Sequence, residues 1–350
     1  MSSGVFFFVI IGRSFAIITI VTVIACPQNW NESRTASFLT ELDEAANEPD
    51  LIIDFSSLKF ASPYATLLAA KVIRNVATFR EMIGLKTRAQ GVDSSVSAVS
   101  YLGHVGFFHF SGIDFGNKPN QAKGNLRYIP ITIIRRDDLQ HPDLRIQEQI
   151  KDRSRHLASV VLSGSTDDSY TDVLSYSFTE AIRNVFEHAD VDECIIMAQR
   201  WENGWAEIAI ADEGRGLLAS LSESHAIDDE AAAITEAIKP GISRIVEPEN
   251  DDVWQNSGFG LFVISELGKR FGSFALASGS KMLLINRWRF WYPIPSGGTA
   301  LKLRVNIPEP EYFPNILRAI VEEGEKMAAS IEGARKTASK VSRSSRHFAT

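Results

Sequence analysis

The chain is poor in cysteine and lacks an excess of positive charge. Its two cysteines, Cys26 and Cys194, lie far apart and do not have the spacing of a zinc site. Such a sequence excludes a disulfide framework and favours a reducing, cytoplasmic environment. The formal net charge of −7 argues against a protein that coats nucleic acid, so we expect no nucleic-acid partner.

Long uninterrupted apolar runs are also scarce, and the most apolar segment, residues 5–26, has two interpretations. A membrane span needs about 20 apolar residues with few charges. Arg13 lies in the middle of this segment, where a charge costs roughly 3 kcal/mol on insertion scales. The β-branched run at residues 17–23 is typical of buried strands. We therefore expect two core strands and no membrane contact, with a membrane segment as the alternative.

The length of 350 residues allows two ordinary domains. Strand and helix patterns alternate at the start of the chain, which predicts an α/β domain over residues 1–115. Ser62 is a candidate N-cap, and Pro63 suits the first position of a helix. The expected elements are helices at residues 29–46, 62–76 and 94–102 and a strand at residues 51–55.

The remaining chain divides into three further parts. Residues 116–155 are expected to form a linker, which contains a strand near residues 128–134 and a charged connecting helix over residues 135–155. A second domain is expected over residues 156–310. The C-terminal part, residues 311–350, combines a helical pattern with a basic tail that is rich in Ser, Lys and Arg and is typical of disorder.

Four motifs follow one another in the second domain. In the first, apolar residues at helical spacing place Glu180 and Asn184 on one helix face, because they are four residues apart. A carboxylate beside an amide can hold a metal and polarise a hydroxyl group or a water molecule. On its own, this pair also fits an exposed polar helix face.

The second motif follows an alternating strand at residues 205–210. Asp212 can accept a hydrogen bond from an exocyclic amine, and Gly214 and Gly216 allow a close approach of the backbone to a ligand. An Asp-x-Gly-x-Gly sequence is also typical of an ordinary turn.

The third and fourth motifs are rich in glycine. Ser257, Gly258, Gly260 and Leu261 lead into a helical pattern at residues 262–271, and amide groups at a helix start suit a triphosphate. Thr299 follows two glycines and precedes an alternating strand. Its hydroxyl group could donate to a phosphate, but the sequence also fits the entry to a hairpin.

Taken in this order, the four motifs resemble those of the GHKL (Bergerat-type) ATPase family, over most of residues 170–305. The resemblance implies a two-layer α/β sandwich with a mixed sheet that binds ATP and Mg²⁺. It assigns Asn184 to the magnesium ion and Glu180 to the role of general base. Asp212 would bind the adenine amine. The resemblance also implies nucleotide contacts for Gly214, Gly216, Ser257, Gly258, Gly260, Leu261 and Thr299.

Residues 217–256, between the second and third motifs, correspond to the ATP lid of that family, and we expect them to order when nucleotide binds. His188 matches a histidine that is common at the end of the first motif, and we assign it to helix packing. Other nucleotide signatures are absent from the sequence, because there is no P-loop and no complete dinucleotide fingerprint.

Residues 51–70 are similar to the STAS domain of anti-sigma antagonists. In that family a serine at the start of the following helix is phosphorylated by a GHKL kinase. Alignment on Asp54 and Phe60 places Tyr64 at that position, and Ser62 and Thr66 are out of register. This departure favours a docking or dimerising module over a phosphorylated one.

We therefore predict an ATP-binding regulatory protein with a protein partner, and a homodimer remains open. The first hypothesis is a serine/threonine kinase of the anti-sigma type or a slow ATPase. The second is an atypical histidine kinase with His156 as phosphoacceptor, although the acidic neighbour and downstream proline usual there are missing. The third is an interaction module whose surface changes when ATP binds.

Overall fold

A computed structural model describes residues 4–11, 16–139, 146–162, 168–242, 258–306, 313–331 and 334. The chain forms two compact units. The first comprises residues 1–123 with residues 292–295, and the second comprises residues 124–291 with residues 296–350. In the described part, none of the helices is both long enough and apolar enough to cross a membrane.

The first unit is built on a four-stranded sheet with the order β1-β2-β4-β6. Its β1–β2 pair is antiparallel, and its β2–β4 and β4–β6 pairs are parallel. The strands of this sheet are β1 (Gly4–Ile11), β2 (Ala16–Ala25), β4 (Asp50–Asp54) and β6 (Lys86–Gln90). The other elements are β3 (Asn29–Trp30), α1 (Glu32–Glu44), a 3₁₀ turn (Ala45–Asn47), β5 (Phe60–Ala61), α2 (Pro63–Met82), α3 (Ser97–His104) and α4 (Phe107–Phe110).

The apolar N-terminal segment forms the two strands expected from its β-branched residues, and Val21 and Ile24 of β2 are buried. The first helix begins later than expected. Asn31 caps it by accepting a hydrogen bond from the amide of Arg34 at 3.1 Å, and the residues just before Asn31 pair with β5 instead.

The helix that begins at Pro63 continues to Met82, beyond the expected end at residue 76. Its last turn carries Arg80, which is fully buried and donates to the carbonyl groups of Ala46, Glu48 and Lys86 at 2.7–2.8 Å. These carbonyl groups come from other parts of the unit, so local periodicity could not reveal that a charged residue here supports the helix.

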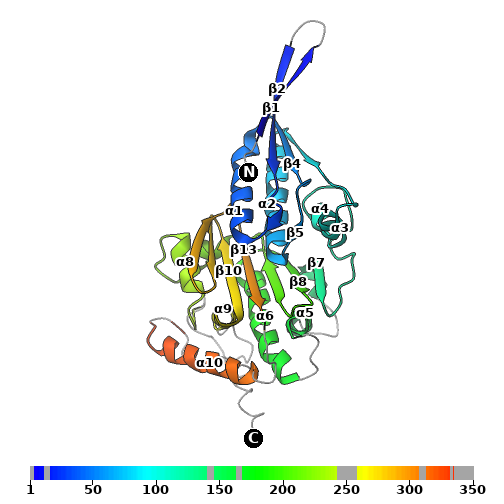
Figure 1. Cartoon of the computed structure of the whole chain (residues 1–350). Helices are drawn as coiled ribbons and strands as arrows, with labels where there is room; N and C mark the ends of the chain where they lie inside the picture. Colours follow the sequence, from blue (N-terminus) through cyan, green and yellow to red (C-terminus); the bar gives the residue numbers. More distant parts are fainter. Residues whose placement is uncertain are drawn as a thin grey trace. The chain divides into compact units, whose positions relative to one another are not determined.

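The second unit has two layers, a seven-stranded sheet and helices on one face of it. Helices α5, α6 and α9 lie side by side on this face, and α10 lies against α6 and α9 (Figure 1). The order of the strands is β12-β11-β10-β13-β9-β8-β7. They are β7 (Tyr128–Arg135), β8 (Glu193–Arg200), β9 (Ala206–Ala211), β10 (Gly272–Ser278), β11 (Lys281–Ile285), β12 (Arg289–Pro293) and β13 (Thr299–Val305).

Six α-helices and a 3₁₀ turn complete the described part of the second unit. Apolar side chains of the sheet and of the helices form one continuous core between the layers. The 3₁₀ turn spans Asp137–Leu139, and the helices are α5 (Ile146–Val161), α6 (Asp168–His188), α7 (Gly216–Leu221), α8 (Glu230–Ala237), α9 (Gly260–Phe271) and α10 (Phe313–Ala329).

Three expectations for this part of the chain need correction. The sheet was expected to be mixed, but the pairs β11–β10, β10–β13, β13–β9, β9–β8 and β8–β7 are all antiparallel. Two of these pairs, β8–β9 and β10–β11, are joined by short hairpin connections, which allow only antiparallel pairing. The charged helix begins at Ile146 and runs to Val161. Residues 116–155, expected to be a linker, supply β7 and part of α5 to the second unit.

Candidate functional site

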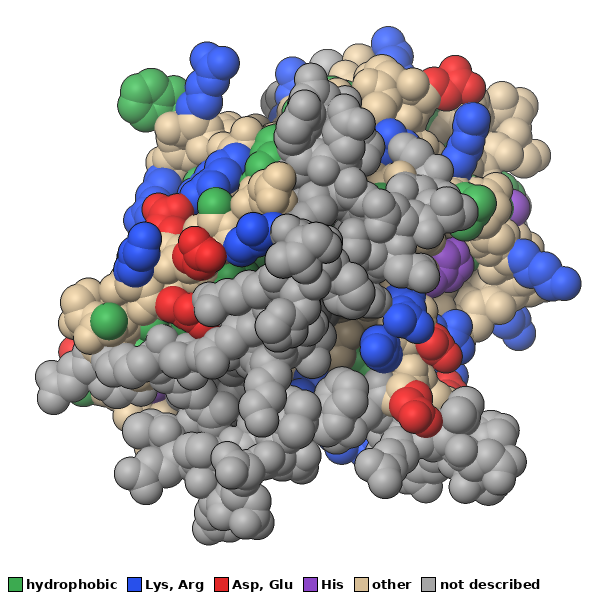
Figure 2. Space-filling view, turned by 90° about the horizontal axis from the view of Figure 1, so that it is seen from below, with side chains coloured by type: hydrophobic (Ala, Val, Ile, Leu, Met, Phe, Trp, Pro, Cys, Tyr) green, Lys and Arg blue, Asp and Glu red, His purple; other side chains and the backbone are tan. Residues whose placement is uncertain are grey.

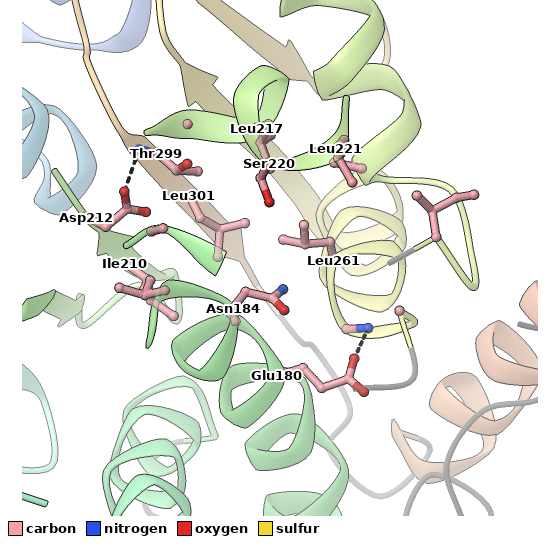
Figure 3. Close-up of a pocket in the computed structure, with 18 residues that line it drawn as sticks. Glu180, Asn184, Ile210, Asp212, Leu217, Ser220, Leu221, Leu261, Thr299 and Leu301 are labelled. Atoms are coloured by element: carbon pink, nitrogen blue, oxygen red, sulfur yellow. Dashed lines mark hydrogen bonds between the residues drawn. The ribbon is translucent and has the colours of Figure 1, made fainter. Parts of the chain in front are cut away.

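Four segments that are distant in the sequence line one cavity in the second unit (Figure 3). The hollow, counted together with the open solvent at its mouth, encloses about 860 Å³ of space outside the protein atoms. Helix α6 contributes Glu180 and Asn184, the end of β9 is followed by Asp212, α9 contributes Gly260, and Thr299 begins β13. The fold therefore brings the four sequence motifs to a single place.

Asp212 lies at one end of the cavity and is almost fully buried, with 3% of its surface exposed. Its Oδ1 atom accepts hydrogen bonds from the amide groups of Gly214 at 2.8 Å and Thr299 at 3.1 Å. The backbone of Asp212 also donates to the carbonyl group of Thr299 at 2.9 Å. These bonds hold the carboxyl group just beyond the end of β9, and its second oxygen points into the cavity in Figure 3.

Glu180 lies at the other end of the cavity and is 2% exposed. Its Oε2 atom accepts a short hydrogen bond from the amide of Gly260, the first residue of α9. Helix α9 has no side-chain cap of its own, because Phe259 stands at the N-cap position. The carboxylate of Glu180 therefore caps α9 from α6, where it also meets the positive end of the helix dipole.

The side chain of Asn184 points into the middle of the cavity, between Glu180 and Asp212 (Figure 3). Its carboxamide oxygen can serve as a ligand for a hard cation. The described residues contain no group of three or more His, Cys, Asp or Glu side chains that could hold a metal ion. A Mg²⁺ ion at Asn184 would therefore take its remaining ligands from water and from the phosphates of a bound nucleotide.

The cavity walls are mostly apolar, which the four motifs did not predict. Leucine and isoleucine side chains face one another across the space between the carboxyl groups of Asp212 and Glu180 (Figure 3). A flat apolar ring fits between such walls. Leu261, which the third motif named, is one of these residues. The helical and strand periodicity around the motifs could have indicated some of the others, which are Ala181, Val185, Ala189, Ile210, Leu217, Leu221, Ala237, Ile242 and Leu301, together with the polar Ser220.

The motif glycines have different tasks. Gly260 allows α9 to approach α6, because a Cβ atom there would lie 2.5 Å from Oε2 of Glu180 and 2.6 Å from its Cβ. Gly216 and Gly258 also line the cavity. Gly214 lies outside the lining, against the carbonyl group of Ala189, where a Cβ atom would come within 2.1 Å. Its contribution is therefore to hold the turn after Asp212, rather than to line the cavity.

The charged side chains that line the cavity are all acidic. Its described lining includes two carboxyl groups and no Lys or Arg side chain. A triphosphate that entered this space would therefore need a cation and the amide groups at the start of α9 to offset its charge. Burial raises the pKa of the Cys194 thiol well above its usual value, and the nearby Asp212 carboxyl adds to this rise, so Cys194 stays a neutral packing group.

Some of the remaining predicted residues lie outside the described part of the chain. Ser257 lies outside the described residues, as does the side chain of His188. His156 is exposed on α5. The part of the expected lid up to residue 242 is already ordered, because α7 and α8 pack on β10 and α8 also packs on β11. The remainder of that interval, residues 243–257, lies outside the described residues.

The hydroxyl groups near the expected phosphorylation position of the first unit are enclosed. Tyr64 is 1% exposed and Thr66 is fully buried. Ser62 is 4% exposed and makes no side-chain cap bond to α2. The side chains at and near this position are thus inaccessible to another protein in this structure.

No protein-family model matches the chain, and neither the curated proteins nor the solved structures contain a match to it.

Proposed function

We propose that the second unit binds ATP with Mg²⁺ and that the chain is a regulatory protein with kinase or slow ATPase activity. The observation that carries this proposal is the convergence of Glu180, Asn184, Asp212 and the start of α9 on one apolar-walled cavity. The resemblance to GHKL ATPases supports the same assignment independently of the geometry.

The adenine ring would lie between the apolar walls at the Asp212 end of the cavity. The Oδ2 atom of the Asp212 carboxyl group would accept the exocyclic amine, while Oδ1 stays bonded to Gly214 and Thr299. A ring with a carbonyl oxygen in place of the amine would face repulsion from the carboxylate. The site therefore favours adenine over hypoxanthine or guanine.

The phosphates would extend toward the start of α9, where Gly260 offers its amide group. Glu180 accepts from that amide in the structure, so a phosphate at α9 would compete with the carboxylate for the same donor. Displacement from α9 would leave Glu180 able to accept a proton from a hydroxyl group or a water molecule. Mg²⁺ supplies the positive charge that the described lining lacks, and Asn184 would provide the protein ligand for it.

Calorimetry with wild type and Asp212→Asn tests the adenine assignment. The substitution preserves the acceptor for Gly214 and Thr299 but turns an amide donor toward the base. We expect the wild type to bind ATP more tightly than inosine triphosphate in the presence of Mg²⁺. Asp212→Asn should weaken ATP binding by at least about tenfold, which is about 1.4 kcal/mol, and should abolish or reverse the preference for ATP.

Asp228→Asn is the matched control, because Asp228 is an exposed aspartate outside the cavity lining. It should bind both nucleotides as the wild type does. Absence of any heat of binding with well-folded wild-type protein, with and without Mg²⁺, would remove the proposed function altogether.

Incubation with γ-labelled ATP separates the catalytic alternatives. Label on serine or threonine of a protein supports a kinase, free phosphate alone supports a slow ATPase or a nucleotide-gated module, and acid-labile label on His156 supports a histidine kinase. Glu180→Gln should retain nucleotide binding but lose turnover by at least about 100-fold, a typical contribution of a general base. Wild-type turnover in this variant would show that Glu180 is not the base.

A further inference from the structure

The two edges of the seven-stranded sheet differ in how they are protected. Strand β7 forms one edge, and most of its residues are buried. Strand β12 forms the other edge, and four of its five residues are exposed. Among the described residues, no strand pairs with the outer side of β12. Proteins usually protect such edges, because their free amide and carbonyl groups can pair with another chain.

The side chains at this edge are large and apolar on both faces of the strand. Trp288, at the tip of the β11–β12 hairpin, is 72% exposed, Phe290 is 40% exposed and Trp291 is 42% exposed. They lie within four consecutive residues, and Phe290 and Trp291, as neighbours in a strand, point to opposite faces of the sheet. Exposed aromatic residues of this density mark interaction sites more often than ordinary surface.

Two arginines accompany these aromatic residues: Arg287 precedes Trp288, Arg289 lies between Trp288 and Phe290, and both are exposed. Within the described part of the chain, neither forms an ion pair. Figure 2 shows acidic and basic side chains interspersed over the described part of the face seen there. Two exposed arginines with no ion-pair partner among the described residues give the hairpin a local positive charge in a chain of net charge −7.

The tip of the hairpin is held in a defined shape. The side chain of Asn286 accepts a hydrogen bond from the amide of Trp288 at 2.8 Å, and the amide of Asn286 donates to the carbonyl group of Trp288 at 3.0 Å. Because the turn is already formed, the hairpin loses less conformational entropy when it binds a partner. The surface is thus built in advance and does not need a partner in order to fold.

We propose that this aromatic–arginine hairpin, residues 287–291, binds an acidic peptide in an extended conformation, which adds a strand to the outer edge of β12. The backbone of the peptide would pair with the free edge, and its carboxylates would bind Arg287 and Arg289. The aromatic rings would cover its apolar side chains. A strand partner fits better than a lipid surface, because β12 is an edge strand and its residues Arg289–Trp291, which belong to the second unit, are exposed.

The proposed site lies outside the nucleotide cavity, so it is independent of the proposed ATP binding. The full chain can be tested by fluorescence anisotropy with a fluorescein-labelled peptide of about ten residues that alternates Glu and Val. We expect saturable binding that weakens strongly between 0.1 M and 1 M salt, as the screening length falls from about 10 Å to about 3 Å. The double variant Arg287→Glu/Arg289→Glu should bind at least about tenfold more weakly.

Two matched controls make the result specific. Arg34→Glu reverses the charge of an exposed arginine on α1 and should bind the peptide as the wild type does. A peptide in which Pro replaces each Val keeps the charge but loses amide donors, and it should bind at least about tenfold more weakly than the original. Circular dichroism of each variant checks that it is folded.

Three results would overturn the proposal. The first is equal binding of the proline peptide, which would reduce the contact to charge alone. The second is unchanged affinity in the double arginine variant when its fold is intact. The third is that the chain does not bind the peptide and instead binds phosphatidylserine vesicles through the hairpin, or self-associates through Trp288 in sedimentation experiments.

Discussion

At the residue scale, the contact between Glu180 and Gly260 links two of the sequence motifs. A glycine is needed at residue 260 because α9 begins directly against the side chain of Glu180. The hydrogen bond between them gives α9 the cap that its own sequence lacks. The same bond places the candidate base where the phosphates of a nucleotide would bind. The position of the start of α9 and the hydrogen bonding of Glu180 therefore depend on each other.

This coupling predicts that Gly260→Ala weakens nucleotide binding by at least about tenfold, because the added Cβ would collide with Glu180 and move the start of α9. Gly268→Ala is the control on the same helix, where the Cβ would meet Phe274 instead. Both substitutions should cost about 1–3 kcal/mol of stability through overpacking. Chemical unfolding measures that cost and calorimetry measures affinity, and equal affinities in the two variants would contradict the coupling.

At the scale of elements, α8 connects two parts of the second unit. Its N-terminal end is capped by Asp229, which accepts from the amide of Ala232 at 2.8 Å, and Glu230 accepts from the amide of Ser280 at 2.7 Å and from its hydroxyl group. Its C-terminal end leads to Gly241, which donates to the carbonyl group of Gly258 at 3.0 Å. Helix α8 and the residues that follow it therefore connect the β10–β11 turn with Gly258, just before α9.

We expect Glu230→Ala to loosen α8, because it removes both bonds to Ser280. Amide hydrogen exchange in residues 230–238 should become about tenfold faster, which corresponds to a local opening free energy lower by about 1.4 kcal/mol. Glu236→Ala, on the same helix, removes only an ion pair with Lys239 and should change exchange by less than about threefold. Similar exchange rates in both variants would show that the bonds to Ser280 do not hold the helix.

At the scale of the whole molecule, the chain divides into units with separate cores, and only the second contains the candidate nucleotide cavity. Because the two units have separate cores, we expect two unfolding transitions. A ligand stabilises only the part of a protein that binds it when the other part unfolds independently. Nucleotide binding can therefore assign each unfolding step to a unit.

We predict that Mg²⁺-ATP at about 100 times its dissociation constant stabilises one of two unfolding transitions by about 2.7 kcal/mol and leaves the other unchanged. Urea unfolding followed by circular dichroism measures both transitions. The Asp212→Asn variant should show the same two transitions with a much smaller shift. Equal shifts in both transitions of the wild type would mean that the units unfold together.

Much of the local structure could be read from the sequence. The β-branched residues at 17–23 form a strand, Pro63 begins a helix, and Glu180 and Asn184 share a helix face. These features depend on neighbours within a few residues, so local sterics and periodicity are sufficient to predict them. The glycines at residues 258 and 260 also indicated a helix start with exposed amide groups, and α9 does begin at Gly260.

Contacts between distant residues were decided only by the tertiary structure. Arg80 extends α2 because carbonyl groups from other elements receive its guanidinium group, and β7 joins the second unit through pairing with β8. Likewise, Glu180 caps a helix that begins 80 residues later. Such partners are chosen by three-dimensional packing, which places donors and acceptors together without leaving a local pattern in the sequence.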